Sequence, residues 1–255
     1  ELPEIERIEW LVIDDGSSDG TEQEAREHGV DHFLKLDRHE GLAGAFKAGV
    51  ERCLALGADI IVNTDADNQY CAADIPKLVS PILSRQAEIV VGARPIGSIE
   101  HFSFIKKKLQ SLGSLVVRTI SGTGIPDASS GFRAISREAA LRLNIFSNYT
   151  YTLEMIIQAG RKNITMTWVP VRVNSETRHS RLVKSNASYV LRSVLTMTRI
   201  FITYKPMRFF LILGSAPFAA GFVLGLRWLV LFFGGTTSSH VPSLILAAIL
   251  LLVGV

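Results

Sequence analysis

Asp65, Asp67 and Gln69 stand at alternate positions just after the apolar run Asp59–Asn63, and their oxygens could hold a metal ion. In an extended chain, side chains two residues apart face the same side, so both carboxylates could grip one divalent cation. Mg²⁺ and Mn²⁺ favour such oxygen ligands together with diphosphate oxygens. A bound cation would stabilise the negative charge that builds up as a nucleoside diphosphate departs. An Asp-x-Asp pair is also common in solvated turns, so this pair alone does not establish a metal site.

Asp14 and Asp15 form a second acidic pair, at the end of the apolar run Trp10–Ile13. Adjacent carboxylates repel each other, and a ligand that offers hydrogen-bond donors, such as a nucleobase edge or ribose hydroxyls, would offset that repulsion. A glycine follows directly and would let a ligand approach the backbone closely. A calcium loop that starts at Asp15 is excluded, because its twelfth position is Arg26 instead of the required glutamate.

Strands and helices alternate along the first half of the chain, and this alternation determines where the acidic pairs lie. Short apolar runs predict strands over Trp10–Ile13, Phe33–Leu36, Asp59–Asn63 and Glu88–Val91. Helical spacing, capping residues and terminal glycines predict helices from Thr21 to Gly29, over Leu42–Leu56 and after Asp74. Asp74 is expected to cap the third of these helices. Such alternation predicts a parallel sheet with helices on both faces. Ligands bind at the carboxyl ends of such strands, so Asp14-Asp15, Asp65–Asp67 and Arg94 are expected at one edge.

The second half of the chain departs from this simple alternation. We expect helices over Ile105–Ile120 and Thr152–Arg161, strands at Gly131–Arg133 and Ile164–Val173, and a basic amphipathic helix over Lys184–Tyr204. The first of these helices begins with Lys106, Lys107 and Lys108, which form either a solvated helix start or a phosphate-binding cluster. Glu154 is either a surface carboxylate of its helix or a catalytic base.

An almost uncharged segment ends the chain. Phe209–Leu226 carries no charge, and Arg227 alone separates it from Trp228–Phe233. About 20 apolar residues cross a bilayer, so we expect one transmembrane helix here and the start of a second in Val241–Val255. Basic residues precede the first span and the loop after it has none, which predicts a cytosolic location for the residues before the span. The chain lacks an initial Met and stops within an apolar run, so we interpret it as a fragment whose first strand precedes Glu1.

Composition and chain length argue against three other kinds of protein. The formal net charge of +3 is too small to indicate nucleic-acid binding by itself. Two cysteines, Cys53 and Cys71, provide no disulfide framework and suit a reducing compartment. A phosphoacceptor receiver module also has paired aspartates, but it would be complete well before the later motifs of this chain.

Six short motifs follow one another at separations that indicate one family. They are Val12–Thr21 (VIDDGSSDGT), Gly41–Gly49 (GLAGAFKAG), Thr64–Gln69 (TDADNQ), Gly92–Arg94, Asp127 with Ser130–Arg133, and Arg178–Leu182. Together they resemble family 2 glycosyltransferases with the GT-A fold, over about residues 8–205. Within that family the chain is similar to dolichol-phosphate mannose synthases and bacterial polyprenol-phosphate glycosyltransferases. The last motif departs from the usual pattern, with His179 in place of a glycine-containing spacing and Arg181 where lysine is often found.

The resemblance implies an α/β fold with a Rossmann-like GT-A domain, and it implies a role for each motif. Nucleotide contacts would come from Asp14, Asp15, Ser17 and Asp65, and the Mg²⁺ or Mn²⁺ ligands would be Asp65, Asp67 and Gln69. Catalytic residues would be Arg94, Asp127 and Arg133, with Arg94 facing the acceptor phosphate and Asp127 orienting the acceptor or acting as base. Phosphates would also be bound by Lys107, Lys108, Arg178, Ser180 and Arg181. The expected boundaries are 1–183 for the cytosolic catalytic domain, 184–206 for the amphipathic helix and 207–255 for the transmembrane region.

The same resemblance implies an inverting, metal-dependent transfer of a hexose from a donor of the GDP-mannose or UDP-glucose type. The acceptor would be a polyprenol phosphate, either dolichol or undecaprenyl phosphate, at the cytosolic face of a bacterial or archaeal membrane. The alternative is a transferase that acts on another lipid-linked or polysaccharide acceptor in cell-envelope biosynthesis. A processive polysaccharide synthase is disfavoured, because its Gln-x-x-Arg-Trp motif requires glutamine where Leu224 precedes Arg227-Trp228. The oligomeric state is left open.

Overall fold

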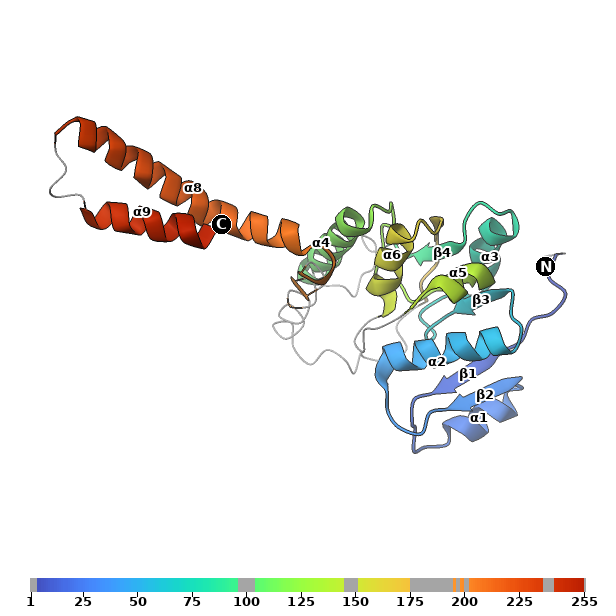
Figure 1. The fold of residues 1–255 in the computed structure, drawn as a ribbon. Helices are drawn as coiled ribbons and strands as arrows, with labels where there is room; N and C mark the ends of the chain where they lie inside the picture. Colours follow the sequence, from blue (N-terminus) through green and yellow to red (C-terminus); the bar gives the residue numbers. More distant parts are fainter. Residues whose placement is uncertain are drawn as a thin grey trace. The chain divides into compact units, whose positions relative to one another are not determined.

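The computed structural model describes residues 4–95, 104–144, 151–174, 195, 198–199, 202–235 and 241–254. Two compact units make up the chain, Glu1–Ser193 and Val194–Val255. In chain order, the first unit contains β1 (Leu11–Asp14), α1 (Thr21–Glu27), β2 (His32–Lys35), α2 (Gly41–Ala55), β3 (Ile60–Asn63), the 3₁₀ turn η1 (Ala72–Asp74), α3 (Ile75–Leu83), β4 (Ile89–Ala93), α4 (Phe104–Ser121), β5 (Arg133–Ser136), α5 (Arg137–Arg142), α6 (Tyr151–Arg161) and β6 (Met166–Pro170) (Figure 1). The strands predicted before Arg94 are confirmed to within two residues, whereas α5 was not predicted.

Four strands form a mixed sheet in the order β3-β5-β4-β6, and β1 and β2 form a separate parallel pair. β5 runs antiparallel to both of its neighbours, with Ala134 opposite Val62 on one side and Val90 on the other. The prediction of one parallel sheet is therefore wrong in two respects, because β5 is antiparallel and because β1 and β2 do not join the other four strands. Arg94, just after β4, binds Asp127 in the loop before β5. The chain consequently enters β5 from the edge at which β4 ends, and it must run back across the sheet.

The strands that precede the polar motifs end at a common edge. β3 and β4 both run antiparallel to β5, so their carboxyl ends point the same way. Asp15, which follows β1, accepts a hydrogen bond from the backbone N–H of Gly41 at the start of α2. α2 begins at this edge and runs away from it for about 22 Å, and β3 then runs in the opposite direction and ends at the same edge (Figure 1). Both aspartate pairs and Arg94 thus lie at one edge, as the sequence predicts.

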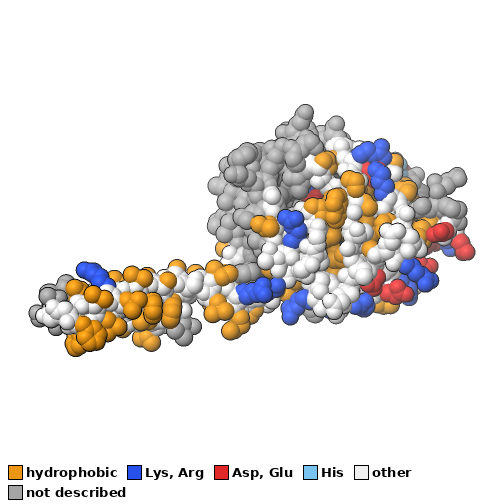
Figure 2. Space-filling view, turned by 90° about the horizontal axis from the view of Figure 1, so that it is seen from above, with side chains coloured by type: hydrophobic (Ala, Val, Ile, Leu, Met, Phe, Trp, Pro, Cys, Tyr) orange, Lys and Arg blue, Asp and Glu red, His pale blue; other side chains and the backbone are white. Residues whose placement is uncertain are grey.

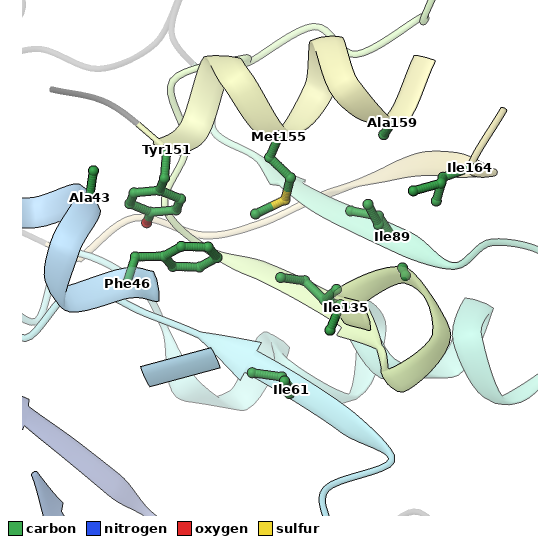
Figure 3. Close-up of a cluster of buried hydrophobic side chains, with 11 residues drawn as sticks. Ala43, Phe46, Ile61, Ile89, Ile135, Tyr151, Met155, Ala159 and Ile164 are labelled. Carbon is green, nitrogen blue, oxygen red and sulfur yellow. The ribbon is translucent and has the colours of Figure 1, made fainter. Parts of the chain in front are cut away.

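Apolar layers cover both faces of the sheet. On one face Phe46 of α2 stacks on Tyr151 of α6, with ring centroids 3.9 Å apart and planes inclined by 7° (Figure 3). On the other face Leu78 of α3 packs in a cluster with Val90. Ile89 and Val90 are successive residues of β4 and belong to opposite layers, because side chains alternate along a strand. Burial on both faces explains why the sequence of β4, IVVGA, is uninterrupted by polar residues.

The second unit contains two apolar helices, α8 (Pro206–Phe233) and α9 (Val241–Gly254), that pack antiparallel. Gly214 lies against Gly254, and Gly221 lies against Ala247. A Cβ atom on Gly214 would come within 2.5 Å of the Gly254 carbonyl oxygen, so this close approach requires a glycine. Figure 2 shows hydrophobic side chains along much of the surface of this hairpin.

α8 is long and apolar enough to cross a membrane, as the sequence predicts. The 14 residues of α9 extend for about 21 Å, which is less than the hydrocarbon thickness of about 30 Å. Among the described residues, α8 is the one helix with the length of a membrane span, and the second span stays a prediction. The predicted amphipathic helix Lys184–Tyr204 falls mostly outside the described residues. Within this range only residues 195, 198–199 and 202–204 are described, and they are helical.

The carboxylate of Asp74 does not cap α3, although the sequence predicts that it does. It is fully buried and accepts hydrogen bonds from the backbone N–H and the guanidinium of Arg172, over 2.7–3.2 Å. The Nζ atom of Lys77 lies 2.8 Å from it. The hydrogen bonds from Arg172 hold the pKa of Asp74 below its ordinary value. This ion pair fastens the segment that follows β6 to the start of α3.

We expect Asp74→Asn to lower the thermal unfolding temperature of the detergent-solubilised protein at pH 7, because Arg172 and Lys77 lose their charged acceptor. The pKa of Asp74 is lower in the folded than in the unfolded chain, so its stabilising effect is complete above about pH 4 and is lost as the pH falls further. The difference in unfolding temperature between wild type and variant should therefore shrink from pH 7 to pH 3. Asp37→Asn, at an exposed position, is the control. An equal difference at both pH values would contradict the ion-pair assignment.

Candidate active site

Asp65 and Asp67 follow β3 at the shared edge, and their environments differ. Asp65 is half-buried, and no group in the described part of the chain donates a hydrogen bond to its carboxylate. Burial and then the charge of Asp67 raise the pKa of Asp65, although Arg94 and Arg133 act in the opposite direction. Asp67 is exposed and accepts a hydrogen bond from the backbone N–H of Gln69 at 3.0 Å. A cation between the two carboxylates would compensate the buried charge and the repulsion together.

The oxygens near Asp65 suit Mg²⁺ or Mn²⁺. Such ions are commonly held by one or two carboxylates, with the remaining positions filled by phosphate oxygens and water. Asp65 and Asp67 supply the carboxylates, and the Oε1 atom of Gln69 is held nearby by the Nη1 atom of Arg94, at 3.4 Å. Within the described ranges, no cluster of three or more His, Cys, Asp or Glu side chains could hold a metal ion. A cation at this edge would therefore need further oxygens from its ligand, such as those of a nucleoside diphosphate.

Gly131 allows the Asp65 carboxylate to lie directly against the loop that precedes β5. A Cβ atom on Gly131 would come within 2.7 Å of Asp65 Oδ2. The peptide groups of Gly131 are fixed from two sides, because its N–H donates to Tyr70 Oη at 3.1 Å and its carbonyl accepts from Asn63 Nδ2 at 2.8 Å. The same Asn63 amide donates to Tyr151 Oη at 2.9 Å. Burial raises the pKa of both tyrosines, so their phenols stay protonated at neutral pH.

Arg94 and Asp127 form a buried bidentate ion pair that links the end of β4 to the same loop. Arg94 Nε lies 2.7 Å from Asp127 Oδ2, and Arg94 Nη2 lies 3.1 Å from Oδ1 and 2.9 Å from Ser129 Oγ. Burial alone would raise the pKa of Asp127, but the hydrogen bonds and charge of Arg94 outweigh it and hold the pKa below its ordinary value. An ionised carboxylate held in this way is a weak proton acceptor. Arg94 donates its hydrogen bonds to the protein itself. The geometry therefore favours a role for both residues in holding the loop before β5, over their predicted catalytic role.

The side chain of Arg133 is completely enclosed, and its predicted catalytic role stays a prediction. Its guanidinium donates hydrogen bonds to the carbonyl oxygens of Ala128 and Ser130 at 2.8 Å and of Thr152 at 2.7 Å. Burial lowers the pKa of Arg133, and the surrounding carbonyl oxygens satisfy its donors. Arg133 thus supports the loop before β5 from within the domain.

Asp14 and Asp15 bind backbone groups of the chain itself. Asp14 is buried and accepts from the N–H of Ser17 at 2.9 Å, and the hydrogen bonds from Ser17 lower its pKa. Asp15 accepts from the N–H groups of Glu40 at 2.7 Å and Gly41 at 2.8 Å, at the start of α2. The sequence predicts that a ligand offsets the repulsion between the adjacent carboxylates, whereas in the structure these backbone donors offset it. The nucleotide contacts of Asp14, Asp15 and Ser17 stay predictions.

The first turns of α2 connect the two acidic pairs. Asp15 binds the start of this helix, and Phe46, about 8 Å further along it, stacks on Tyr151. Tyr151 accepts the hydrogen bond from Asn63, which lies two residues before Asp65. A chain of contacts through α2, Tyr151 and Asn63 thus links Asp15 to the strand end that precedes Asp65. One ligand that extends along this edge could contact both acidic pairs.

Several predicted phosphate-binding residues have no described side chain. Lys107 and Lys108 belong to α4, but their side chains lie outside the described residues, and Arg178, Ser180 and Arg181 lie outside entirely. Their roles stay predictions. Glu154 is buried on α6 and accepts a hydrogen bond from Gln158 Nε2 at 3.1 Å, so it is not the surface carboxylate that was one of its two interpretations.

Three side chains that organise the edge were not identified from the sequence, namely Asn63, Tyr70 and Tyr151. Asn63 gave a usable signal, since a polar residue that ends an apolar strand commonly faces a site at the sheet edge. The tyrosines gave none, because their hydrogen-bond partners are 61 and 88 residues away in the sequence.

A family model and two curated relatives match this chain. The sequence model described as "Glycosyl transferase family 2" matches residues 2–143. An undecaprenyl-phosphate mannosyltransferase of Micrococcus luteus is 28% identical over 200 residues, which cover 74% of this chain and 80% of that protein. A UDP-N-acetylglucosamine–dolichyl-phosphate N-acetylglucosaminyltransferase of Methanococcus voltae is 30% identical over 186 residues, which cover 64% of this chain and 73% of that protein.

A solved structure supports the same fold. Glucosyl-3-phosphoglycerate synthase of Mycobacterium tuberculosis, in complex with Mn²⁺, UDP and glucosyl-3-phosphoglycerate, superposes with a TM-score of 0.57. The match covers 77% of this chain and 68% of that chain at 19% identity. The described domain therefore has a GT-A-like α/β fold, as the sequence predicts.

Gly131→Ala is expected to displace the Asp65 carboxylate and to weaken Mn²⁺ binding about tenfold or more, as changes around metal ligands commonly do. Isothermal titration of Mn²⁺ in the presence of UDP or GDP would measure this effect. Gly124→Ala is the matched control, since a Cβ atom there would meet no atom within 4 Å. Equal Mn²⁺ affinity in both variants and the wild type would refute the proposed contact between Gly131 and Asp65.

Proposed function

The chain belongs to glycosyl transferase family 2, and we propose that it transfers a sugar from a nucleoside diphosphate donor to a polyprenol phosphate at a membrane. The half-buried Asp65 carboxylate beside Asp67 carries this proposal, because a cation with a bound diphosphate would compensate both charges. Asp14 ends β1, Asp15 and Ser17 follow it at the same end of the domain, and the three residues are the proposed nucleotide contacts. The donor is proposed to be of the GDP-mannose or UDP-glucose type.

The relatives' names support the class of acceptor. One relative is named for transfer to undecaprenyl phosphate and another for transfer to dolichyl phosphate. Both names specify a polyprenyl phosphate, whereas the transferred sugars differ. The apolar helix α8 suits an enzyme whose acceptor is embedded in a lipid bilayer. Lys205 and Arg208 flank its start, which supports a cytosolic position for the preceding domain by the positive-inside rule.

In the proposed mechanism the carboxylates of Asp65 and Asp67, with Gln69, would hold Mg²⁺ or Mn²⁺. The fold relative was crystallised with Mn²⁺ and UDP, which supports this choice of ions. A bound cation would stabilise the negative charge of the departing nucleoside diphosphate. Gly131 leaves space for the Asp65 carboxylate, and the Arg94 side chain donates a hydrogen bond to Gln69. Binding donor and acceptor side by side would then supply most of the rate enhancement.

The acceptor requires little help from a base. A phosphate monoester loses its second proton with a pKa of about 6, so it is largely a dianion at neutral pH and is itself the nucleophile. In-line attack on the anomeric carbon would invert its configuration. Lys107, Lys108, Arg178, Ser180 and Arg181 are the proposed partners of the donor and acceptor phosphates. This assignment agrees with the ion pair that holds Asp127 and leaves it poorly suited to accept a proton.

Transfer from radiolabelled GDP-mannose, UDP-glucose or UDP-N-acetylglucosamine to polyprenol phosphate in detergent tests the proposal. We expect one donor to support metal-dependent transfer, and we expect Asp67→Ala to reduce the rate about a hundredfold or more while the unfolding temperature changes little. Unphosphorylated polyprenol is the acceptor control and should receive no sugar. Full activity of Asp67→Ala, or equal transfer to the unphosphorylated lipid, would reject the metal site or the acceptor, respectively.

The pH dependence of transfer separates acceptor ionisation from a protein base. At saturating donor and metal, kcat/KM should fall below about pH 6, where the acceptor phosphate gains a proton. Asp127, with its lowered pKa, should contribute no ionisation in this range. Asp127→Asn should therefore lower the rate through loss of the Arg94 pair and leave the shape of the profile unchanged. Disappearance of the acid limb in that variant would identify Asp127 as the base.

A further inference from the structure

Asn174, after β6, donates hydrogen bonds to the loop that carries the proposed metal ligands Asp67 and Gln69. Its side-chain Nδ2 donates to the carbonyl oxygens of Asn68 at 2.9 Å and Tyr70 at 3.2 Å. Its backbone N–H donates to the carbonyl oxygen of Gln69 at 2.9 Å. One residue thus binds three consecutive carbonyl groups directly behind Asp67, although it is more than 100 residues away in the sequence.

The loop needs such external support because its own conformation is unusual. Asn68 has φ of +57°, in the left-handed region that residues other than glycine rarely adopt. Asp67 contributes a local contact to the Gln69 N–H, but that bond leaves the carbonyl groups of the turn unpaired. Unpaired carbonyl groups would favour other conformations of the loop. The three bonds from Asn174 satisfy them in one arrangement.

The segment that bears Asn174 is itself anchored by separate contacts. Val171 N–H donates to the Ala93 carbonyl oxygen, and Arg172 pairs with the buried Asp74. Val173 forms a β-bridge with Tyr70. Loss of the Asn174 amide would therefore leave the segment in position and change chiefly the loop in front of it.

On the basis of the proposed function, we propose that Asn174 is a positioning residue for the metal-bound donor. By fixing the carbonyl groups of residues 68–70, it sets the direction in which the Asp67 and Gln69 side chains leave the loop. These oxygens then face the same cation as Asp65, for whose carboxylate Gly131 leaves space. Asn174 does not itself touch the metal or the donor in this role.

The test measures Mn²⁺ binding to the full chain in detergent with saturating UDP or GDP. The electron paramagnetic resonance signal of free Mn²⁺ reports how much of the ion is unbound. Asn174→Asp is the informative variant, because aspartate has nearly the same shape but an ionised carboxylate cannot donate to carbonyl oxygens. We expect its Mn²⁺ dissociation constant to rise about tenfold, as loss of one or two net hydrogen bonds would give. Its unfolding temperature should change little.

Arg172→Ala is the matched control, because it weakens the anchor of the same segment and leaves the Asn174 contacts in place. We expect it to lower the unfolding temperature and to keep the Mn²⁺ affinity of the wild type. Unchanged Mn²⁺ affinity in Asn174→Asp, or an equal loss in both variants, would overturn the positioning role. Absence of Mn²⁺ binding by the wild type with either nucleotide would instead reject the proposed function on which this inference depends.

Discussion

The half-buried negative charge of Asp65 is the constraint around which the sheet edge is organised. Burial and the neighbouring Asp67 both disfavour this charge, and no described group donates a hydrogen bond to it. Gly131 leaves space for this carboxylate beside the loop that precedes β5, because a Cβ atom there would clash with it. Asn63 and Tyr70 bind the peptide groups of Gly131 and so fix the position of that loop. The proposed cation and diphosphate would supply the missing compensation.

Arginines near this edge serve mainly to build it. Arg133 binds three backbone carbonyl groups, Arg94 binds Asp127 and Gln69, and Arg172 binds Asp74. A guanidinium suits this work because its five N–H donors lie in one plane and can bridge several loops at once. The three side chains connect the ends of β4, β5 and β6 to the loops between them. Direct phosphate contacts are consequently proposed for Lys107, Lys108, Arg178, Ser180 and Arg181.

The sequence predicted the features that depend on local patterns. Apolar runs and helix ends located β1 to β4 with α1 to α3, and the common edge of Asp14 and Asp65 followed from strand direction. The reversed direction of β5 and the burial of Arg133 were missed. Both depend on contacts between distant segments, such as the Arg94–Asp127 pair, that no local pattern reveals. For the same reason the sequence did not reveal that Asp14 and Asp15 accept hydrogen bonds from backbone N–H groups of the protein itself.

The central claim is that cation and nucleotide bind together at one edge, and binding linkage tests it most directly. Isothermal titration would give the dissociation constants of UDP and GDP with and without Mn²⁺, for the wild type and for Asp65→Ala. We predict that Mn²⁺ tightens binding of the preferred nucleotide about tenfold or more in the wild type, and that this enhancement is absent in Asp65→Ala. Nucleotide binding that is equally tight without Mn²⁺, or an enhancement that survives in Asp65→Ala, would contradict the account.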